Sequence, residues 1–360
     1  NMSGSGTTWT YAYTAPAGNG TDTFAFSVGT DAAGNTVTSA PTSGATVTVD
    51  NTAPTISAVT QVVTPSNDTT PSYVFTTNET GTVTTNIGAG IDSGGTVTST
   101  GENTVTFNTL DAGTYADKTI TLTDAAGNTS SLTLVTFVID TTAPTAAITY
   151  NSVSPYKNGD TVTITATFNG PVADSPVPTI AIAGSGIANV ASTNMTKTST
   201  TVYTYSYAVP TGDGTGTVTV GTGQDAAGNV VTSTPTSGAT FTVDNTAPTG
   251  AITYSADGPY KQGATATVTA TFTEALTTTP KIAISGVSTV VATNMSGSGT
   301  TWTYAYTAPA GNGTDTFAFS VGTDAAGNTV TSAPTSGATV TVDNTAPSLT
   351  AVTQVVTPSN

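Results

Sequence analysis

Cysteine, histidine and arginine are absent from the 360 residues, and lysine occurs only five times. Without histidine or cysteine, the usual ligand sets for zinc, haem and iron–sulfur clusters are missing. Histidine acid–base catalysis and cysteine nucleophiles are excluded for the same reason, and so are disulfide bonds. Five scattered lysines cannot form the basic surface that binds nucleic acid. We therefore expect neither an enzyme nor a nucleic-acid partner.

Long apolar runs are also missing, since none approaches the roughly 18–20 residues of a membrane span. The 21 acidic residues give a net charge of −16, and a high net charge can indicate disorder. Only 7% of the residues are charged, however, and Val, Ile, Tyr and Phe recur in alternation. Threonine, valine and tyrosine favour strands, while 37 glycines and 19 prolines interrupt the chain at short intervals. This composition indicates a folded β protein.

Aromatic residues that fall on every second position mark individual strands. Trp302, Tyr304 and Tyr306 follow this pattern, and so do the tyrosines at 203, 205 and 207. A period of two places these side chains on one face of a strand. No 3.6-residue periodicity is evident. Many short strands separated by Gly/Pro turns predict antiparallel β-sandwiches.

Repeats set the predicted architecture. Residues 1–67 recur at 294–360 with three differences, at positions 55, 56 and 57. The sequence Asp-Ala-Ala-Gly-Asn occurs at 31–35, 124–128, 225–229 and 324–328, and Asp-(Asn/Thr)-Thr-Ala-Pro occurs at 50–54, 140–144, 244–248 and 343–347. The spacing of the second motif is 90, 104 and 99 residues, which is the size of one small sandwich domain.

The chain is therefore predicted to be a tandem array of Ig-like antiparallel β-sandwich domains that forms an elongated rod. There are two kinds of module, a shorter and a longer one, and they follow the period short–long–long. The predicted modules are 1–50 (C-terminal part of a long-type module), 51–140 (short type), 141–244 and 245–343 (both long type) and 344–360 (start of a further short-type module).

Modules that end in Val-Asp-Asn-Thr-Ala-Pro and carry Asp-Ala-Ala-Gly-Asn before the last strand resemble tandem bacterial Ig-like domains. Such domains form the long stalks of giant surface adhesins and related extracellular repeat proteins. The resemblance covers essentially the whole chain. It implies an extracellular or cell-surface location and calcium at the domain junctions. No adhesive tip, membrane anchor or secretion signal lies within these residues.

The positions of the carboxylates point to calcium independently. In an Ig-like sandwich the loop before the last strand lies at the N-terminal pole, so Asp124 is expected near Asp50, which ends the preceding module. The second-strand loop adds Glu79 at the same pole. Three converging carboxylates repel one another unless a hard cation binds them, and calcium takes six to eight oxygen ligands. The same spacing predicts a second calcium site at Asp244, Glu274 and Asp324.

The remaining candidate ligands are weaker. Counting from Pro144 places Asn169 where the other modules have Glu, so the junction of Asp140 and Asp225 has one carboxylate fewer. Asn51 and Asn245 could add side-chain or backbone oxygens, and Asp31 and Asp343 are half-sites. A metal-free alternative remains open. Asp-Ala-Ala-Gly-Asn is a good tight turn and Asp-Asn-Thr-Ala-Pro a good linker without any metal.

Together these features predict a structural stalk segment that holds a distal element away from the cell, with neighbouring modules and calcium as its partners. Two alternatives stay open. The modules could associate laterally into a self-assembling extracellular fibre or sheath, or they could form a glycan-binding array that recognises a surface ligand. Near-identical long repeats favour a spacer or a fibre, because both need many equivalent units.

Overall fold

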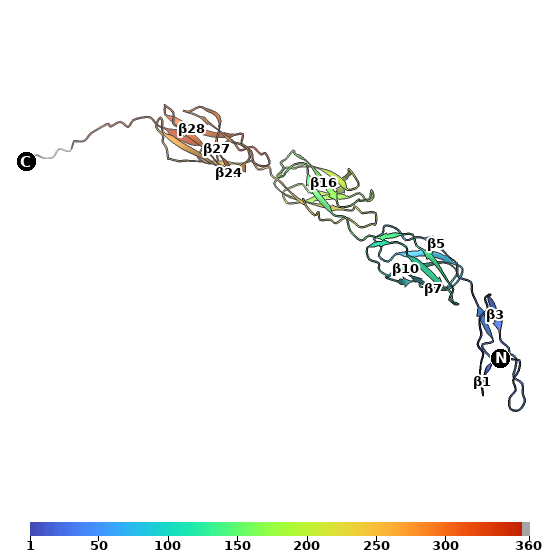
Figure 1. Ribbon diagram of the computed structural model, residues 1–360. Helices are drawn as coiled ribbons and strands as arrows, with labels where there is room; N and C mark the ends of the chain where they lie inside the picture. The colour runs from blue at the N-terminus through green and yellow to red at the C-terminus, as the bar shows by residue number, and fades with distance from the viewer. Residues whose placement is uncertain (355–360) are drawn as a thin grey trace, which may run out of the picture. The chain divides into compact units, whose positions relative to one another are not determined.

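The computed structural model describes residues 1–354, and all regular secondary structure in that part of the chain is β-strand (Figure 1). Burial follows the predicted period of two. In β16 (Thr161–Phe168) the threonines face outward or are half-buried, while Val162, Ile164 and Ala166 are buried. All sheet pairings between named strands are antiparallel. The prediction of an all-β fold made of tandem β-sandwiches is confirmed.

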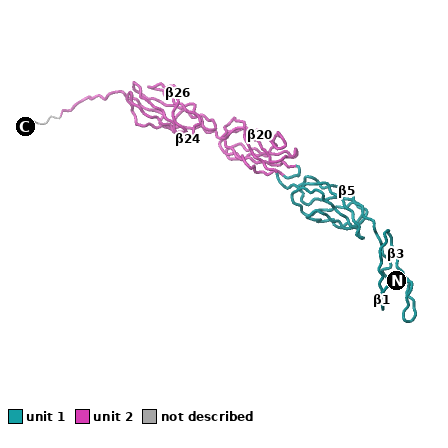
Figure 2. The backbone as a smooth tube through the Cα atoms, in the orientation of Figure 1, with its two compact units in different colours: residues 1–143, 226–229 teal, residues 144–225, 230–360 magenta. Residues whose placement is uncertain are grey.

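The chain divides into two compact units, which Figure 2 shows in different colours. Unit 1 consists of residues 1–143 and 226–229, and unit 2 of residues 144–225 with the described part of 230–360. The finer module boundaries drawn from the sequence stay predictions. Among residues 1–354 there is no helix long and apolar enough to cross a membrane.

The complete sandwich of unit 1 has two four-stranded sheets, in the orders β5-β6-β10-β8 and β13-β12-β7-β9, and a pair formed by β11 and β14. Its core includes the fully buried Tyr73, Phe75, Phe107 and Leu122. The strands are β5 (Ile56–Thr60), β6 (Ser72–Thr77), β7 (Gly81–Thr85), β8 (Ile91–Ser93), β9 (Thr96–Val97), β10 (Gly101–Phe107), β11 (Gly113–Tyr115), β12 (Thr119–Thr123), β13 (Thr129–Thr133) and β14 (Phe137–Ile139).

The first 50 residues of unit 1 contain only two short strand pairs. The first joins β1 (Ser3–Ser5) to β2 (Thr8–Thr10), and the second joins β3 (Gly20–Thr23) to β4 (Thr46–Val49). Most side chains of these strands are exposed, including Trp9 at 53%. Residues 1–50 therefore lack the two packed layers that make a sandwich.

Unit 2 contains two sandwiches with separate cores, one drawn from residues 146–220 and 231–243 and the other from residues 252–342. The first has sheets β15-β16-β20-β19 and β18-β17-β21-β22, and the second has sheets β23-β24-β27 and β26-β25-β28-β29. The strands are β15 (Ala146–Tyr150), β16, β17 (Thr179–Ala183), β18 (Val190–Asn194), β19 (Thr196–Lys197), β20 (Val202–Ala208), β21 (Gly214–Gly221), β22 (Thr240–Val243), β23 (Gly250–Tyr254), β24 (Thr265–Leu276), β25 (Lys281–Ser285), β26 (Val290–Asn294), β27 (Ser296–Thr307), β28 (Gly313–Ser320) and β29 (Thr339–Val342).

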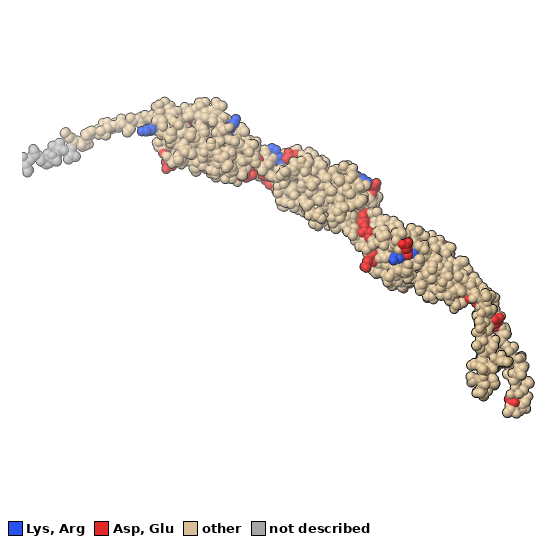
Figure 3. All heavy atoms as spheres, in the orientation of Figure 1, with Lys and Arg blue, Asp and Glu red and all other residues tan. Residues whose placement is uncertain are grey.

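Pairing of β5 with β6, β15 with β16, and β23 with β24 places corresponding residues opposite one another. Ile56 lies opposite Thr77, Ala146 opposite Phe168, and Gly250 opposite Phe272. This shared register makes it possible to compare the loops that follow the second strand, residue by residue. Figure 3 shows that charged atoms occupy small areas of a surface that is otherwise uncharged.

Candidate metal centres

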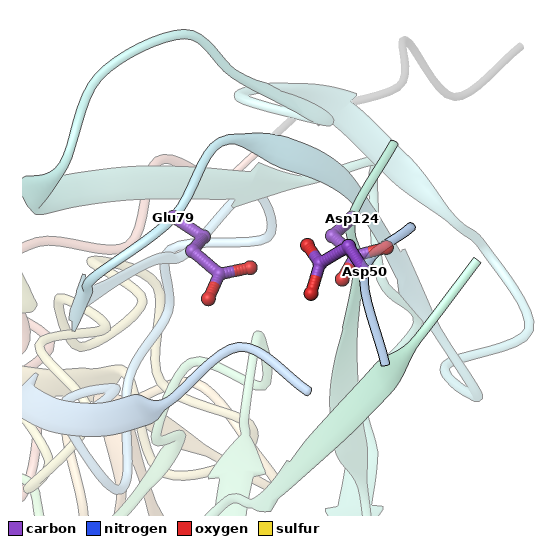
Figure 4. Close-up of side chains that lie close together, drawn as sticks. All are labelled: Asp50, Glu79 and Asp124. Atoms are coloured by element: carbon purple, nitrogen blue, oxygen red, sulfur yellow. The ribbon is translucent and has the colours of Figure 1, made fainter. Parts of the chain in front are cut away.

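Two groups of three carboxylates form in residues 1–354, one in each compact unit. In unit 1, carboxylate oxygens of Asp50, Glu79 and Asp124 lie within 4.8 Å of one another. Figure 4 shows the Glu79 side chain extending toward the carboxylates of Asp50 and Asp124. The structure thus brings together one complete triplet of predicted ligands from residues up to 74 positions apart in the sequence.

The second group belongs to unit 2 and consists of Asp244, Glu274 and Asp324, whose carboxylate oxygens meet the same 4.8 Å limit. Asp324 is only 3% exposed, while Asp244 and Glu274 are half-buried. The structure therefore also brings together the second predicted triplet.

The aspartate at the end of each module is held by a local turn. One carboxylate oxygen of Asp50 accepts a hydrogen bond from the backbone N–H of Thr52 at 3.0 Å, and Asp244 accepts one from Thr246 at 3.0 Å. Such a bond to the backbone two residues ahead is an Asx turn, which the sequence Asp-Asn-Thr favours. The turn directs the carboxylate at the point where the chain leaves the last strand.

The aspartate of the Asp-Ala-Ala-Gly-Asn turn is oriented more firmly. Asp124 Oδ1 accepts hydrogen bonds from the N–H groups of Ala126 and Asn128 at 2.8 and 2.9 Å. Asp124 Oδ2 accepts one from the Asn128 side chain at 2.9 Å, and this bond, followed by the backbone bonds, lowers the pKa of Asp124. Gly127 closes the turn with a φ of +98°, a conformation that glycine adopts without strain. The carboxylate is therefore fixed and charged.

Asparagine at the fifth position of this turn has a second role that the sequence reasoning missed. The Asn128 side chain donates to the backbone carbonyl of Asp50 at 3.1 Å, and Asn328 donates to that of Asp244 at 2.9 Å. Each turn is thereby tied to the end of the preceding module. The recurrence of asparagine in all four copies of the turn was the available signal.

Glutamate enters each group from the loop after the second strand. Glu79 is the second residue after β6, and the Thr77 hydroxyl both donates to the Glu79 carbonyl at 3.0 Å and accepts from its N–H at 3.2 Å. The side-chain oxygen of Asn78 accepts a hydrogen bond from the N–H of Thr55 at 2.6 Å, and its amide donates to Glu79 Oε1 at 3.5 Å. Asn78 is thus held at Thr55, while Glu79 supplies the carboxylate that lies near the two aspartates.

Electrostatic repulsion is evident in the second group. Burial raises the pKa of Glu274, and the negative charges of Asp244, Asp324 and Asp213 raise it further. Asp213 stands where residues 1–50 and 245–343 carry Asn19 and Asn312. A cation bound by these oxygens would remove the repulsion. Oxygen-only ligands suit calcium, whose six to eight contacts would be completed by bidentate carboxylates, carbonyls and water.

The module of residues 144–244 corrects one sequence-based assignment. The N–H of Thr145 donates to Asn169 Oδ1 at 2.9 Å, as the N–H of Thr55 does to Asn78. Asn169 therefore corresponds to Asn78, and the residue at the position of Glu79 is Gly170. The count of 25 residues from the proline holds in the short module, but both longer modules have one residue more before this position, since Ala146 lies opposite Phe168 and Gly250 opposite Phe272.

Asn51 and Asn245 belong to neither three-carboxylate group. The Asn51 side chain donates to the carbonyls of Pro16 and Gly18 at 3.3 and 3.0 Å. The side-chain oxygen of Asn245 accepts a hydrogen bond from the N–H of Asn158 at 2.5 Å. Both amides thus fasten the linker to loops of the preceding residues, and their role as metal ligands stays a prediction.

Four further predicted ligands lie outside the two groups within the described residues. Asp31 starts a turn like that of Asp124, and the hydrogen bond from the Asn35 side chain at 2.9 Å lowers the pKa of Asp31. Asp140 and Asp343 form Asx turns with the N–H groups two residues ahead, at 2.9 and 2.8 Å. Asp225 begins the third turn of this type. Metal binding by these four residues stays a prediction.

No family model and no curated relative matches this chain. Among solved structures, it is similar to a fragment of titin (12% identity, TM-score 0.28), covering 79% of this chain and 99% of that one. It is also similar to a putative membrane anchored protein from Corynebacterium diphtheriae (14% identity, TM-score 0.23, 84% and 97% covered) and to the FN1-FN3 domains of chicken CNTN1 (12% identity, TM-score 0.24, 77% and 94% covered). At identities and TM-scores this low, the similarity indicates nothing about the function of this chain.

Proposed function

We propose that this chain is a spacer segment of an extracellular bacterial surface protein of the adhesin type, and that calcium stiffens its module junctions. The observation that carries the proposal is the pair of three-carboxylate groups, each of which joins the aspartate that ends one predicted module to two acids of the next. A cation bound there holds both modules at one point. Extracellular modules bind calcium with Kd values of about 10⁻⁴–10⁻³ M, which matches extracellular calcium.

A spacer needs many equivalent, well-soluble units and no reaction centre. The chain fits this requirement because its repeats are nearly identical and its charged residues are few apart from the acids at the junctions. Lateral association into a fibre remains the alternative, and sedimentation of the full chain at rising concentration would reveal it.

Calorimetric calcium titration of the full chain tests the proposal. We expect two sites, with Glu79→Gln and Glu274→Gln each removing one. Glu102 is the matched control, because it is the only other glutamate and is exposed on β10 outside both groups. Absence of calcium binding, or loss of binding in E102Q, would contradict the proposal.

Stiffening is tested separately by small-angle scattering. In millimolar calcium the radius of gyration should be larger and the flexibility lower than in chelator, because ligation offsets the loss of hinge freedom. E79Q combined with E274Q should give the chelator result under both conditions. Equal scattering with and without calcium would show that the ions, even if bound, do not set the shape.

A gain of binding would test the corrected register. Gly170→Glu places a carboxylate in the position that Glu79 and Glu274 hold, and a Cβ at residue 170 meets nothing within 4 Å. Together with Asp225 in the same module, the new carboxylate is expected to add weak calcium binding. Asn169→Glu is the matched comparison and should add none, because that position faces the N–H of Thr145.

A further inference from the structure

A loop near the start of each complete sandwich ends beside the last strand of the same sandwich. In this loop Ser66, Tyr156 and Tyr260 form isolated parallel bridges with β14, β22 and β29, respectively. The residue that follows each of them is Asn67, Lys157 or Lys261. Since the last strand leads directly into the linker, these three residues lie at the end of the module that the linker leaves.

Two of the three residues contact an Asp-Ala-Ala-Gly-Asn turn. In unit 1 the backbone N–H of Asn67 donates to the carbonyl of Ala227 at 3.0 Å. In unit 2 the ammonium of Lys157 donates to the carbonyl of Gly327 at 2.6 Å, across 170 residues of sequence. Ala227 and Gly327 are the third and fourth residues of their turns. The same loop position therefore contacts the same kind of turn twice.

The Lys157 contact is the stronger of the two by its chemistry. A hydrogen bond with a charged donor is worth more than one between neutral groups. Gly327 presents its carbonyl without a side chain, and a Cβ there would come within 3.2 Å of the Lys157 ammonium. Glycine at position 327 thus adopts the positive φ of the turn, +86°, without strain and leaves room for the lysine ammonium.

The turn that Lys157 contacts is also the turn that carries Asp324. Asn328 of this turn donates to the carbonyl of Asp244 at 2.9 Å, so the turn has two attachments to the preceding sandwich. One comes from the linker and the other from the loop of Lys157. Neither attachment involves a carboxylate ligand, and neither needs a cation.

We propose that Lys157 is a metal-independent strap, whose ammonium holds the Asp324–Asn328 turn of the following sandwich and so limits the hinge inside unit 2 before any cation binds. The surface that it recognises is a backbone carbonyl displayed by an Asp-Ala-Ala-Gly-Asn turn. Lys261 occupies the same loop position, and its ammonium makes no hydrogen bond within residues 1–354. Lys261 is therefore the matched control.

The test measures a distance between the two sandwiches of unit 2 in the full chain. Because the protein has no cysteine, Thr217→Cys on β21 and Thr301→Cys on β27, both exposed, can carry a pair of spin labels. Distance distributions are recorded in chelator for the parent, Lys157→Met, Lys157→Arg and Lys261→Met. Circular dichroism and Trp302 fluorescence check that each variant is folded.

We expect K157M to broaden the distribution, with the ratio of undocked to docked sandwiches rising about tenfold, as expected for the loss of one charge-assisted hydrogen bond. K157R keeps a cationic donor and should retain the narrow distribution, and K261M should match the parent. If the distance distribution of K157M in chelator is as narrow as that of the parent, or if the distribution of K261M broadens equally, the proposal for Lys157 is wrong. Should K157M fail to fold, Lys157→Gln takes its place with the same criteria.

Repeating the distance measurements in calcium tests the role of Lys157 separately from the proposed function. If the carboxylate groups bind calcium, adding calcium to K157M should narrow the distribution again. If the distribution is broad in chelator and stays broad in calcium, the strap stands while the calcium proposal for this junction fails. A narrow distribution in K157M under both conditions overturns the strap only.

Discussion

Residues 1–50 and 294–343 have the same sequence and different structures. Trp9 is 53% exposed, whereas its counterpart Trp302 is 7% exposed. Phe26 is 36% exposed, whereas Phe319 is 1% exposed. The second copy forms β27, β28 and β29, and the first forms four strands of three or four residues. Local sequence is therefore not what separates a core residue from a surface residue here.

Strand partners explain the difference. In the second copy β27 pairs with β24 and β28 pairs with β25, which places Ile282 opposite Phe319 and Ile284 opposite Phe317. Residues 1–50 have no counterpart of β23, β24 and β25 before them in this sequence. A strand that is apolar on one face buries that face only when a second layer covers it.

The largest expected effect comes from supplying those partners. Residues 248–293 placed directly ahead of Asn1 should complete the sandwich and bury Trp9. The chain has only two tryptophans, so Trp302→Phe leaves Trp9 as the sole reporter, and Trp9→Phe leaves Trp302. Trp9 emission should shift to the blue position that Trp302 shows in the parent. Red-shifted Trp9 emission after the addition would mean that the missing strands are not the cause.

The second test concerns an acid that is buried in one copy only. Asp315 is fully buried and accepts hydrogen bonds from the Tyr306 hydroxyl at 2.7 Å and the Ser288 N–H at 2.5 Å. Asp315→Ala leaves both donors without this partner and should destabilise the sandwich by about 1–3 kcal/mol. Urea unfolding followed by Trp302 fluorescence in a Trp9→Phe background measures it.

The matched change in the first copy is Asp22→Ala. Asp22 accepts a hydrogen bond from Tyr13 at 2.5 Å, but Asp22 is exposed and Tyr13 only half-buried, so water replaces the lost bond. D22A should leave unfolding unchanged. A loss of stability as large as that of D315A would show that burial does not explain the difference between the two aspartates.

Calcium should raise the thermal stability through the second copy of the turn only, and by less than the stability changes expected above. Asp324 lies beside Asp244 and Glu274, whereas Asp31 belongs to no such group among the described residues. At a calcium concentration about tenfold above Kd, one site stabilises the fold by about 1.4 kcal/mol. Asp324→Asn should remove that calcium-dependent rise in melting temperature. Asp31→Asn should not, and an equal loss in both variants would place the ion elsewhere.

The smallest expected difference is in pH dependence, because only the second copy faces Glu274. The pKa of Glu274 is raised above its ordinary value of 4.5 in the folded protein, so protonation favours folding. This stabilisation is present below 4.5 and is lost as the pH rises through the raised pKa. Calcium binding needs the carboxylate, so calcium affinity should rise with pH over the same window.

Thermal melting in chelator and calcium titration across that window measure both trends. Glu274→Gln should remove them, and Asp213→Asn should weaken them, because Asp213 contributes to the raised pKa. Glu102→Gln is the control. Unchanged pH dependence in E274Q would show that another group titrates.

Much of the candidate site could be predicted because its turns are local. The bonds from Ala126 and Asn128 to Asp124 close within five residues, and the same sequence forms the same two bonds at the exposed Asp31. The alternation of aromatic residues likewise predicted the strands β20 and β27. The position of Glu79 followed from the order of strands in an Ig-like sandwich, but the same counting misplaced its counterpart at Asn169 instead of Gly170.

The strands, turns and repeats thus follow from the order of the amino acids alone, because hydrogen bonds between near neighbours and a period of two depend only on adjacent residues. Tertiary structure decided which aromatic residues are core, which carboxylates meet and which lysine has a partner. Trp9 and Trp302, Asp31 and Asp324, and Lys261 and Lys157 are pairs with equivalent local sequence and different surroundings. The reason is physical: burial, convergence of charge and contacts across many residues exist only once distant strands have paired and a second layer has closed over the first.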